Sequence, residues 1–324
     1  MFDRIGQGHY ESFFVRGNHP TEPLAFWIRY TLLVPKGRPE AAVAELWAIV
    51  FDGERDHVVA VKERHPLASA VLGRDRFSFR IGAASFEHGS LRGSAHSDPS
   101  RADKHRIAWA LDYDATDPPL LLLPEKLYAG DFPKAKSLVS APLARFRGAL
   151  DVDGRVIELD GWQGSQNHNW GARHTDRYAW GQVAGFDSEP RAFLECATAQ
   201  LKVGPLWTPA MTVVVLRLGD RTIRLNELST AVRAKAERKG FVWSFESATR
   251  QARVAARFFA PPARFVALRY DDPEGRDKIC LNSKLAGCEL RVQLPGEPER
   301  TLHSAHGAAF EILGQDAAGL PIAV

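Results

Sequence analysis

Residues 161–182 read GWQGSQNHNWGARHTDRYAWGQ and combine three tryptophans, two histidines and several amide side chains. Aromatic rings with polar edges, mixed with amides, suit a pocket that is apolar and must also form hydrogen bonds. The same composition is compatible with an internal packing layer, in which the amides satisfy buried backbone groups. The composition of this segment leaves both interpretations open.

Strand patterns flank this segment on both sides. On the N-terminal side, Asp153-Gly154 predicts a tight type I′ turn between strands over 144–152 and 155–159. On the C-terminal side, strands over 178–186 and 191–202 are expected to pair across a polar turn. The segment therefore lies within a run of antiparallel β-structure.

Strand patterns also fill most of the remaining chain. Residues 24–34 read LAFWIRYTLLV and alternate between two apolar faces, one with Trp27 and Arg29, the other with Phe26 and Ile28. Shorter strand patterns, separated by turn residues, cover 11–16, 41–51, 57–63, 76–82, 84–88, 91–96, 106–113, 212–218, 221–225, 241–247, 251–259, 264–270, 278–281, 289–294 and 300–304. Residues 231–238 fit either a short helix or a charged strand. We expect an all-β protein.

Short apolar words recur in the same order in the two halves of the chain, roughly 150 to 165 residues apart, which indicates a duplicated β domain rather than a solenoid. The pairs are 26–30 with 178–182, 43–47 with 192–196, 77–79 with 242–245, and 108–113 with 267–271. Many short antiparallel strands can hide their edges by closing into barrels. The sequence predicts two consecutive antiparallel β-barrels over 1–143 and 144–324, with the proline-rich segment 118–142 as a crossover.

Two predicted strands carry a glutamate among apolar neighbours. Glu45 shares a face with Trp47, and Glu195 lies in a similar apolar strand. Burial disfavours the charged form of a carboxyl, so we expect a raised pKa, which suits a general acid near neutral pH. An arginine partner such as Arg29 or Arg177 would instead make either glutamate a structural carboxylate.

His168 lies between Asn167 and Asn169, where the amides could orient its ring for proton transfer or for holding a water. The spacing of His168, His174 and Asp176 matches no zinc-binding helix motif, so we expect no metal. The chain has no Gly-x-Ser-x-Gly elbow and no Gly-x-Gly-x-x-Gly after a strand. We therefore expect neither a serine nucleophile nor a nucleotide cofactor, and no other cofactor is indicated.

The run His168-Asn169-Trp170-Gly171, then a tryptophan-rich strand, then an acid in the next strand, resembles the two-domain lipocalin-like superfamily. That group includes the carotenoid hydratases (hydroxyneurosporene synthases) and is similar in pattern to tocopherol cyclases and lipocalin-like Diels–Alderases. The resemblance implies two calycin-type β-barrels that handle isoprenoid, polyene or polyketide ligands.

The resemblance also implies positions for the active residues. In the hydratases a His-x-Trp pair is followed by Tyr-x-Asp, and here His168-x-Trp170 is followed by Phe193-x-Glu195 at that spacing. The acid is thus retained as glutamate, whereas the phenol is replaced by phenylalanine. Asn282-Ser283-Lys284 and Ala309-Phe310-Glu311 also fit the tocopherol-cyclase-like pattern.

Composition indicates which classes of partner and which cellular compartment to expect. The net charge is only +3 and the basic residues are scattered, which argues against nucleic acid as a partner. Three cysteines without a CxxC motif argue against a disulfide framework or a structural zinc site and fit a reducing compartment. The chain has no long apolar run for a transmembrane segment and no apolar core for a secretory signal near its start. We expect a cytoplasmic protein.

These observations favour a protein that binds an apolar small molecule and promotes its acid-assisted hydration, cyclisation or isomerisation. Glu195 would donate the proton and His168 would orient the acid or a water. Tryptophan rings would line the pocket and stabilise developing positive charge. The residues expected to contact the substrate are Trp27, Trp162, Asn169, Trp170, Tyr178, Trp180, Gln182 and Phe193. Two alternatives remain open: a non-catalytic carrier of a hydrophobic metabolite, and a protein-interaction platform whose pocket is filled by side chains.

Overall fold

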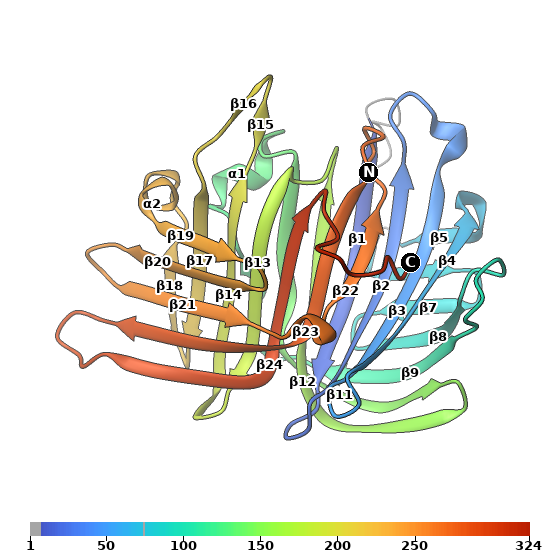
Figure 1. Ribbon diagram of the computed structural model, residues 1–324, viewed down its shortest axis with the longest axis horizontal. Helices are drawn as coiled ribbons and strands as arrows, with labels where there is room; N and C mark the ends of the chain where they lie inside the picture. Colours follow the sequence, from blue (N-terminus) through green and yellow to red (C-terminus); the bar gives the residue numbers. More distant parts are fainter. Residues whose placement is uncertain (1–7, 74) are drawn as a thin grey trace.

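A computed structural model of the chain describes residues 8–73 and 75–324. Two large antiparallel sheets, each rolled toward a barrel, lie side by side (Figure 1). The strands β1 and β12 of the first sheet and β13 and β24 of the second run near the centre of the molecule (Figure 1). The prediction of an all-β protein with two consecutive barrels is confirmed.

The first sheet has the strand order β4-β3-β2-β1-β12-β11-β9-β8-β7-β6-β5, and β10 pairs with β11. Its strands are β1 (His9–Asn18), β2 (Leu24–Val34), β3 (Val43–Asp52), β4 (His57–Pro66), β5 (Ala70–Leu72), β6 (Ser78–Ile81), β7 (Ala84–Glu87), β8 (Ser90–His96), β9 (Arg106–Asp114), β10 (Leu120–Leu121), β11 (Ala135–Val152) and β12 (Arg155–Gly171). Short helical turns join some of them: η2 (Pro39–Ala41), η3 (Leu67–Ser69) and α1 (Lys126–Ala129).

The second sheet has the order β18-β17-β14-β13-β24-β23-β21-β20-β19, and β22 pairs with β23. Its strands are β13 (Arg177–Phe186), β14 (Glu189–Gln200), β17 (Met211–Leu218), β18 (Arg221–Leu225), β19 (Lys235–Lys239), β20 (Val242–Ala248), β21 (Arg253–Phe259), β22 (Val266–Tyr270), β23 (Lys278–Gln293) and β24 (Arg300–Gly314). The other elements are the hairpin β15 (Lys202–Val203) with β16 (Leu206–Trp207), the helix α2 (Leu228–Arg233) and the turn η4 (Pro262–Arg264). Residues 231–238 thus end a helix and begin a strand.

The two sheets repeat one topology. The order β4-β3-β2-β1-β12-β11-β9 in the first sheet matches β18-β17-β14-β13-β24-β23-β21 in the second, and β10 on β11 matches β22 on β23. The predicted duplication is therefore present in the strand order. The apolar segments used to detect it do not lie in equivalent strands, however. Residues 26–30 lie in β2, for example, whereas residues 178–182 lie in β13, the counterpart of β1.

The chain passes from the first sheet to the second between Gly171, where β12 ends, and Arg177, where β13 begins. The boundary expected between residues 143 and 144 falls inside β11, which pairs with β9 and β12 of the first sheet. The proline-rich segment 118–142 also stays with the first sheet, because it contains β10, α1 and the start of β11.

Several strands are longer than their patterns indicated. Residues 161–171, rich in glycine and amides that are uncommon in strands, form the end of β12 and pair with β1. One strand, β23, spans a region predicted as two, and β24 continues beyond Ser304 to Gly314. Bulges between Ser283 and Cys288 shift the register of β23 against β24, which interrupts the alternation on which the prediction relied.

The surroundings of β2 explain why both of its faces are apolar. Every residue of β2 is buried. Phe26 and Ile28 belong to the core of the first barrel, whereas Trp27 points outward and packs against residues of the second barrel, Val266 and Leu268 among them. The outer face of β2 is therefore covered by the other barrel instead of by water.

Two apolar clusters join the barrels. One cluster consists of Phe14, Ala25, Trp27, Trp47, Ile49 and Phe51 from the first barrel with Val266, Leu268, Tyr270, Cys280, Leu285 and Leu313 from the second. The other consists of Leu120, Leu122 and Val139 from the first with Ala184, Phe193 and Val215 from the second. These contacts replace strand pairing at the junction, since the two sheets share no ladder in the described part of the chain.

Two further findings concern the described residues. Cys196, Cys280 and Cys288 are buried free thiols. No helix among residues 8–73 and 75–324 is long and apolar enough to cross a membrane.

Close backbone contact between β1 and β12 depends on a pair of glycines. Gly17 and Gly164 lie opposite each other in register. A Cβ atom on Gly164 would overlap the backbone carbonyl of Arg16. Because a strand backbone cannot move away without breaking the ladder, this position accepts only glycine.

We predict that Gly164→Ala lowers the free energy of unfolding by at least about 2 kcal/mol, since the added methyl group must displace backbone. Gly314→Ala is the matched control, because a Cβ there meets nothing within 4 Å. Urea unfolding of both variants measures the difference. Equal stability of the two variants would contradict the close approach of β1 and β12.

Candidate functional site

A pocket with a cavity volume of about 210 Å³ lies between the two barrels. Its wall is mostly apolar and comes from the outward faces of both sheets, from the segment 122–137 and from α2. Leu122, Ala197 and Met211 are among its apolar residues, and Asn167, Asn169 and Glu195 are among its polar ones. The space for a ligand is therefore outside both barrels, which have packed cores of their own.

Glu195 is the acid expected to donate a proton, and the structure places it at this pocket, 3% exposed. Its Oε1 accepts a hydrogen bond from Trp180 Nε1 at 2.8 Å, and its Oε2 accepts one from Gln182 Nε2 at 2.7 Å. Burial raises the pKa of Glu195 to about 7, although the hydrogen bonds from Trp180 and Gln182 and the charge of Arg16 act to lower it. The predicted upward shift of this pKa is confirmed.

Gln182 is oriented by groups from the first barrel. Its Oε1 accepts hydrogen bonds from Arg16 Nε at 2.6 Å and from Ser165 Oγ at 2.7 Å. Its Nε2 therefore points away from them, and donates to Asn167 Oδ1 at 2.8 Å as well as to Glu195. Because a guanidinium can only donate, Arg16 fixes which end of the Gln182 amide faces the acid. Arg16 is fully buried, and burial lowers its pKa to about 10.

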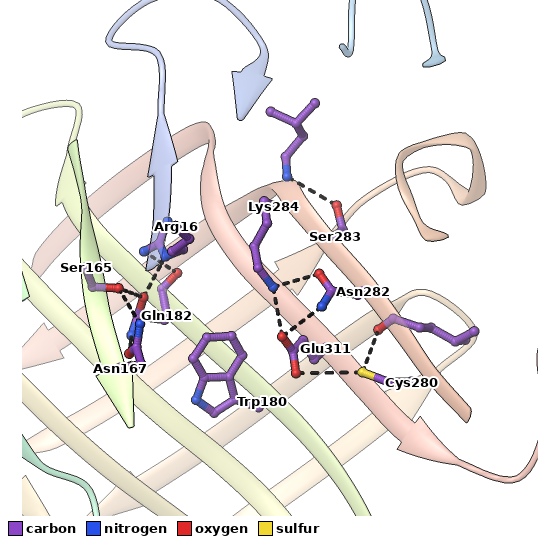
Figure 2. A network of polar contacts seen from close by, with 12 residues as sticks. Arg16, Ser165, Asn167, Trp180, Gln182, Cys280, Asn282, Ser283, Lys284 and Glu311 are labelled. Carbon is purple, nitrogen blue, oxygen red and sulfur yellow. Dashed lines mark hydrogen bonds and ion pairs between the residues drawn. The ribbon is translucent and has the colours of Figure 1, made fainter. Parts of the chain in front are cut away.

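A second buried polar group comes from β23 and β24 of the second barrel. Lys284, which has no exposed surface, donates to Glu311 Oε1 at 2.8 Å and to Asn282 Oδ1 at 2.7 Å. Tyr178 donates to the other oxygen of Glu311 at 3.1 Å. Figure 2 shows the Lys284 group and the Arg16 group on either side of the Trp180 ring. The two segments singled out as tocopherol-cyclase-like, which contain Lys284 and Glu311, thus meet at the junction.

The aromatic residues expected to contact a ligand separate into two sets. Trp27, Tyr178 and Trp180 line the pocket. The Lys284 ammonium lies 5.6 Å from the Trp27 ring and 5.5 Å from the Trp180 ring, so these π faces already hold one cation. Asn169 also lines the pocket, whereas Gln182 contacts it only through Glu195 and Asn167.

Trp162, Trp170 and Phe193 do not line this pocket. Trp162 is buried in the core of the first barrel. Trp170 stacks on His168, with ring centroids 4.4 Å apart. Phe193 shares the outward face of β14 with Glu195 and packs into the apolar cluster with Leu122.

His168 and Glu195 are not brought together. Successive residues of a strand face opposite sides, so His168 faces away from Asn167 and Asn169, which line the pocket. His168 stacks on Phe13 and its Nε2 lies 2.8 Å from Glu11 Oε1. Burial acts to raise the pKa of Glu11, but hydrogen bonds from His168 and His9 outweigh it and hold this pKa at about 2.

Glu45 is a structural carboxylate. Its Oε1 lies 3.0 Å from Lys62 Nζ and 3.2 Å from Arg64 Nε, and its Oε2 accepts a hydrogen bond from Trp47 Nε1. The expected arginine partner is thus present, but it is Arg64 and not Arg29 or Arg177. Glu45 does not line the pocket.

Sequence reasoning missed the roles of Arg16 and Arg29. Arg29 is the one charged residue of the largely apolar strand β2, and Arg16 directly follows the apolar run 13–15 of β1; these positions were the available signal. His174, considered earlier with Asp176, lies at the pocket beside Arg29. No group of three or more His, Cys, Asp or Glu side chains within 8–73 and 75–324 is placed to hold a metal ion.

No protein-family model matches the chain. In sequence it is similar to the uncharacterized proteins MT0513 and Rv0493c of Mycobacterium tuberculosis, with 26% identity over 201 residues in each case. The match covers 62% of this chain and 59% of each relative, so it spans about three fifths of the length of those curated proteins.

Solved structures share the fold over nearly the whole chain. A Nitrosomonas europaea protein provisionally described as ATTH has a TM-score of 0.57 at 11% identity, covering 95% of this chain and 93% of its own. Kievitone hydratase from Nectria haematococca has a TM-score of 0.57 at 11% identity, and CghA with Sch210972 has 0.54 at 12%; each covers 97% of this chain and 90% of its own. The expected resemblance to two-domain lipocalin-like proteins is confirmed at the level of the fold.

The raised pKa of Glu195 predicts a specific pH dependence of stability. The carboxyl ionises near 4.5 in the unfolded chain and near 7 in the folded protein. Across that interval the unfolded chain releases a proton that the folded protein retains, so rising pH favours unfolding. Relative to Glu195→Gln, the wild type should lose about 3 kcal/mol between about pH 4 and about pH 8. Urea unfolding of both proteins over this range tests it, and a constant difference would contradict the shift.

Proposed function

We propose that this protein is an enzyme that binds an apolar isoprenoid, polyene or polyketide molecule between its barrels and promotes acid-assisted hydration, cyclisation or isomerisation. The single observation that carries the proposal is Glu195, a carboxyl buried at an apolar pocket with a pKa of about 7. A carboxyl with this pKa is partly protonated near neutral pH and can transfer a proton in either direction.

The geometry supports one order of steps. Glu195 protonates a carbon–carbon double bond or a carbonyl of the ligand, which then carries the positive charge. Trp180 and Gln182 stay hydrogen-bonded to the carboxylate that is left, and Arg16 lies close enough to favour its charge. A proton then returns to the Glu195 carboxylate in each case. It comes from a carbon next to the cation to give an isomer, or from a water whose oxygen has added to the cation to give a hydrate. A ring forms when an internal double bond or hydroxyl attacks the cation and the product loses a proton.

Two further observations support this reaction class. The neighbour kievitone hydratase is named as a hydratase and has the same fold. Asn169 lines the pocket and its side chain has no hydrogen-bond partner among the described residues, so it is free to hold a water or a ligand oxygen. In this proposal Gln182 and Trp180 orient the acid, and His168 supports the first barrel through Glu11.

A carrier of a hydrophobic metabolite is the second candidate. Both oxygens of Glu195 already accept hydrogen bonds within the protein, which is what a structural acceptor would also do. A carrier would bind the same ligands through the same apolar wall without converting them.

We expect Glu195→Gln to lower kcat at least about 100-fold while the affinity for the ligand changes little, because only the proton is removed. Wild-type kcat should fall as pH rises through about 7, where Glu195 loses its proton. The assay is product formation, by mass spectrometry, from molecules that co-purify with the protein and from a panel of isoprenoid, polyene and polyketide compounds.

His168→Gln is the matched control, because it changes a polar residue that does not line the pocket. The His168→Gln variant should keep the turnover of wild type and the same fall of kcat as pH rises. Equal turnover by wild type and Glu195→Gln would remove the acid role. Quenching of tryptophan fluorescence by a ligand that no variant converts would favour the carrier.

A further inference from the structure

Arg29 is a buried cation at the pocket without a carboxylate partner. It lies on the outward face of β2, is 6% exposed and lines the pocket. Its Nε donates to Ser12 Oγ at 2.5 Å and to Thr31 Oγ1 at 2.9 Å. Its two terminal nitrogens have no hydrogen-bond partner, and no carboxylate lies within 4 Å of them, among residues 8–73 and 75–324. A buried guanidinium normally has most of its donors satisfied.

Other donors near Arg29 are also unused. Trp27, two residues away on the same face, has a buried Nε1 without an acceptor. The His174 ring lines the pocket, packs against the Tyr10 ring at an interplanar angle of 36° and has no hydrogen-bond partner in the described part of the chain. Burial and the charges of Arg29 and Lys278 lower the pKa of His174 to about 3, so the ring is neutral and adds no competing charge.

The acids around this end of the pocket are already engaged. Glu45 is held by Lys62 and Arg64, and Glu311 by Lys284. Asp272 accepts the backbone N–H groups of His174 and Glu274. The aromatic rings beside Arg29, with Tyr270 4.6 Å from its guanidinium carbon, hold its plane in place.

Arg16, in contrast, is a buried arginine whose donors have acceptors within the protein. Its nitrogens donate to the side chains of Gln182 and Asn18 and to the carbonyl of Gly307. Arg16 therefore acts within the protein, whereas the free donors of Arg29 face the ligand space.

We propose that Arg29 is the binding site for a carboxylate on the ligand, with the unused Trp27 and His174 donors beside it. The inference deepens the proposed function, because it assumes that the same pocket holds the ligand. The guanidinium presents two terminal nitrogens in a plane that matches the two oxygens of a carboxylate. The substrate class is then an amphiphilic acid, whose apolar chain extends along the pocket wall that also carries Glu195.

The test measures binding of cis-parinaric acid, a fluorescent polyene fatty acid, and of its uncharged methyl ester to the full-length protein. We expect the acid to bind wild type at least about tenfold more tightly than the ester, because only the acid can pair with the guanidinium. Arg29→Gln should remove this preference by weakening the acid and leaving the ester unchanged. Arg29→Lys, which keeps the charge, should retain part of it.

Lys136→Gln is the matched control. Lys136 is a second basic residue of the pocket wall, but its ammonium donates to the backbone carbonyls of Tyr128 and Gly130. This variant should keep the preference for the acid. Equal binding of acid and ester by wild type, binding of neither, or an unchanged preference in Arg29→Gln would overturn the inference.

Failure of this inference is distinguishable from failure of the proposed function. Glu195→Gln should keep the preference for the acid, since it leaves Arg29 intact. Loss of turnover in Glu195→Gln without any preference of wild type for the acid would support the enzyme and remove the carboxylate site. A preference that depends on Arg29, with no conversion by wild type, would support the site in a carrier.

Discussion

The junction depends on the guanidinium of Arg16, which leaves the first barrel and is buried in the second. It binds the Gln182 side chain and the carbonyl of Gly307, and its neighbour Asn18 binds carbonyls at the bulges of the long strands. A buried cation is costly unless its donors are used, so the contacts of Arg16 admit few relative positions of the barrels. Glu195 receives its orientation through the same chain of hydrogen bonds. The same hydrogen bonds therefore fix both the packing of the two barrels and the orientation of the Glu195 carboxyl.

The two barrels share one architecture, whereas their outward faces differ in the charged residues that they carry. The two barrels have the same strand order, and each uses its inward residues for its own core. On the faces that meet, the first barrel contributes two arginines: Arg16, whose donors are used within the protein, and Arg29, whose terminal nitrogens have no partner among the described residues. The second contributes Glu195 and the Lys284–Glu311 ion pair. Charges that water would solvate and screen on an isolated outer face interact more strongly where two such faces exclude water, at the cost of their hydration.

The sequence was sufficient for the fold class, because alternation in strands such as β2 and turn pairs such as Asp153-Gly154 are local signals. Both turn residues have positive φ values, 55° and 89°, as a type I′ turn requires. Local sequence patterns did not predict a strand over residues 161–171. This segment is rich in glycines and amides, and it forms a strand because β1 and the other barrel cover it.

Some features of the candidate site could also be predicted from the sequence, and others could not. The apolar surroundings of Glu195 indicated its burial and its raised pKa. The separation of His168 from Glu195 was not visible in their spacing, because it depends on which face of β12 points at the second barrel. Arg16 and Arg29 were visible as charges in apolar strands, but their partners lie across a junction that no local pattern describes.

The position of the cavity outside both barrels has an evolutionary consequence. A ligand chamber inside a single barrel is bounded by that barrel's own core, so enlarging it disturbs the packing that keeps the domain folded. Here the chamber is the gap between two separately packed bodies. Substitutions in the contact cluster of Trp47, Leu285 and Leu313 can tilt one body against the other and so reshape the chamber. A scaffold of this kind can therefore change the shape of its cavity through hinge-like adjustments while both cores stay unchanged.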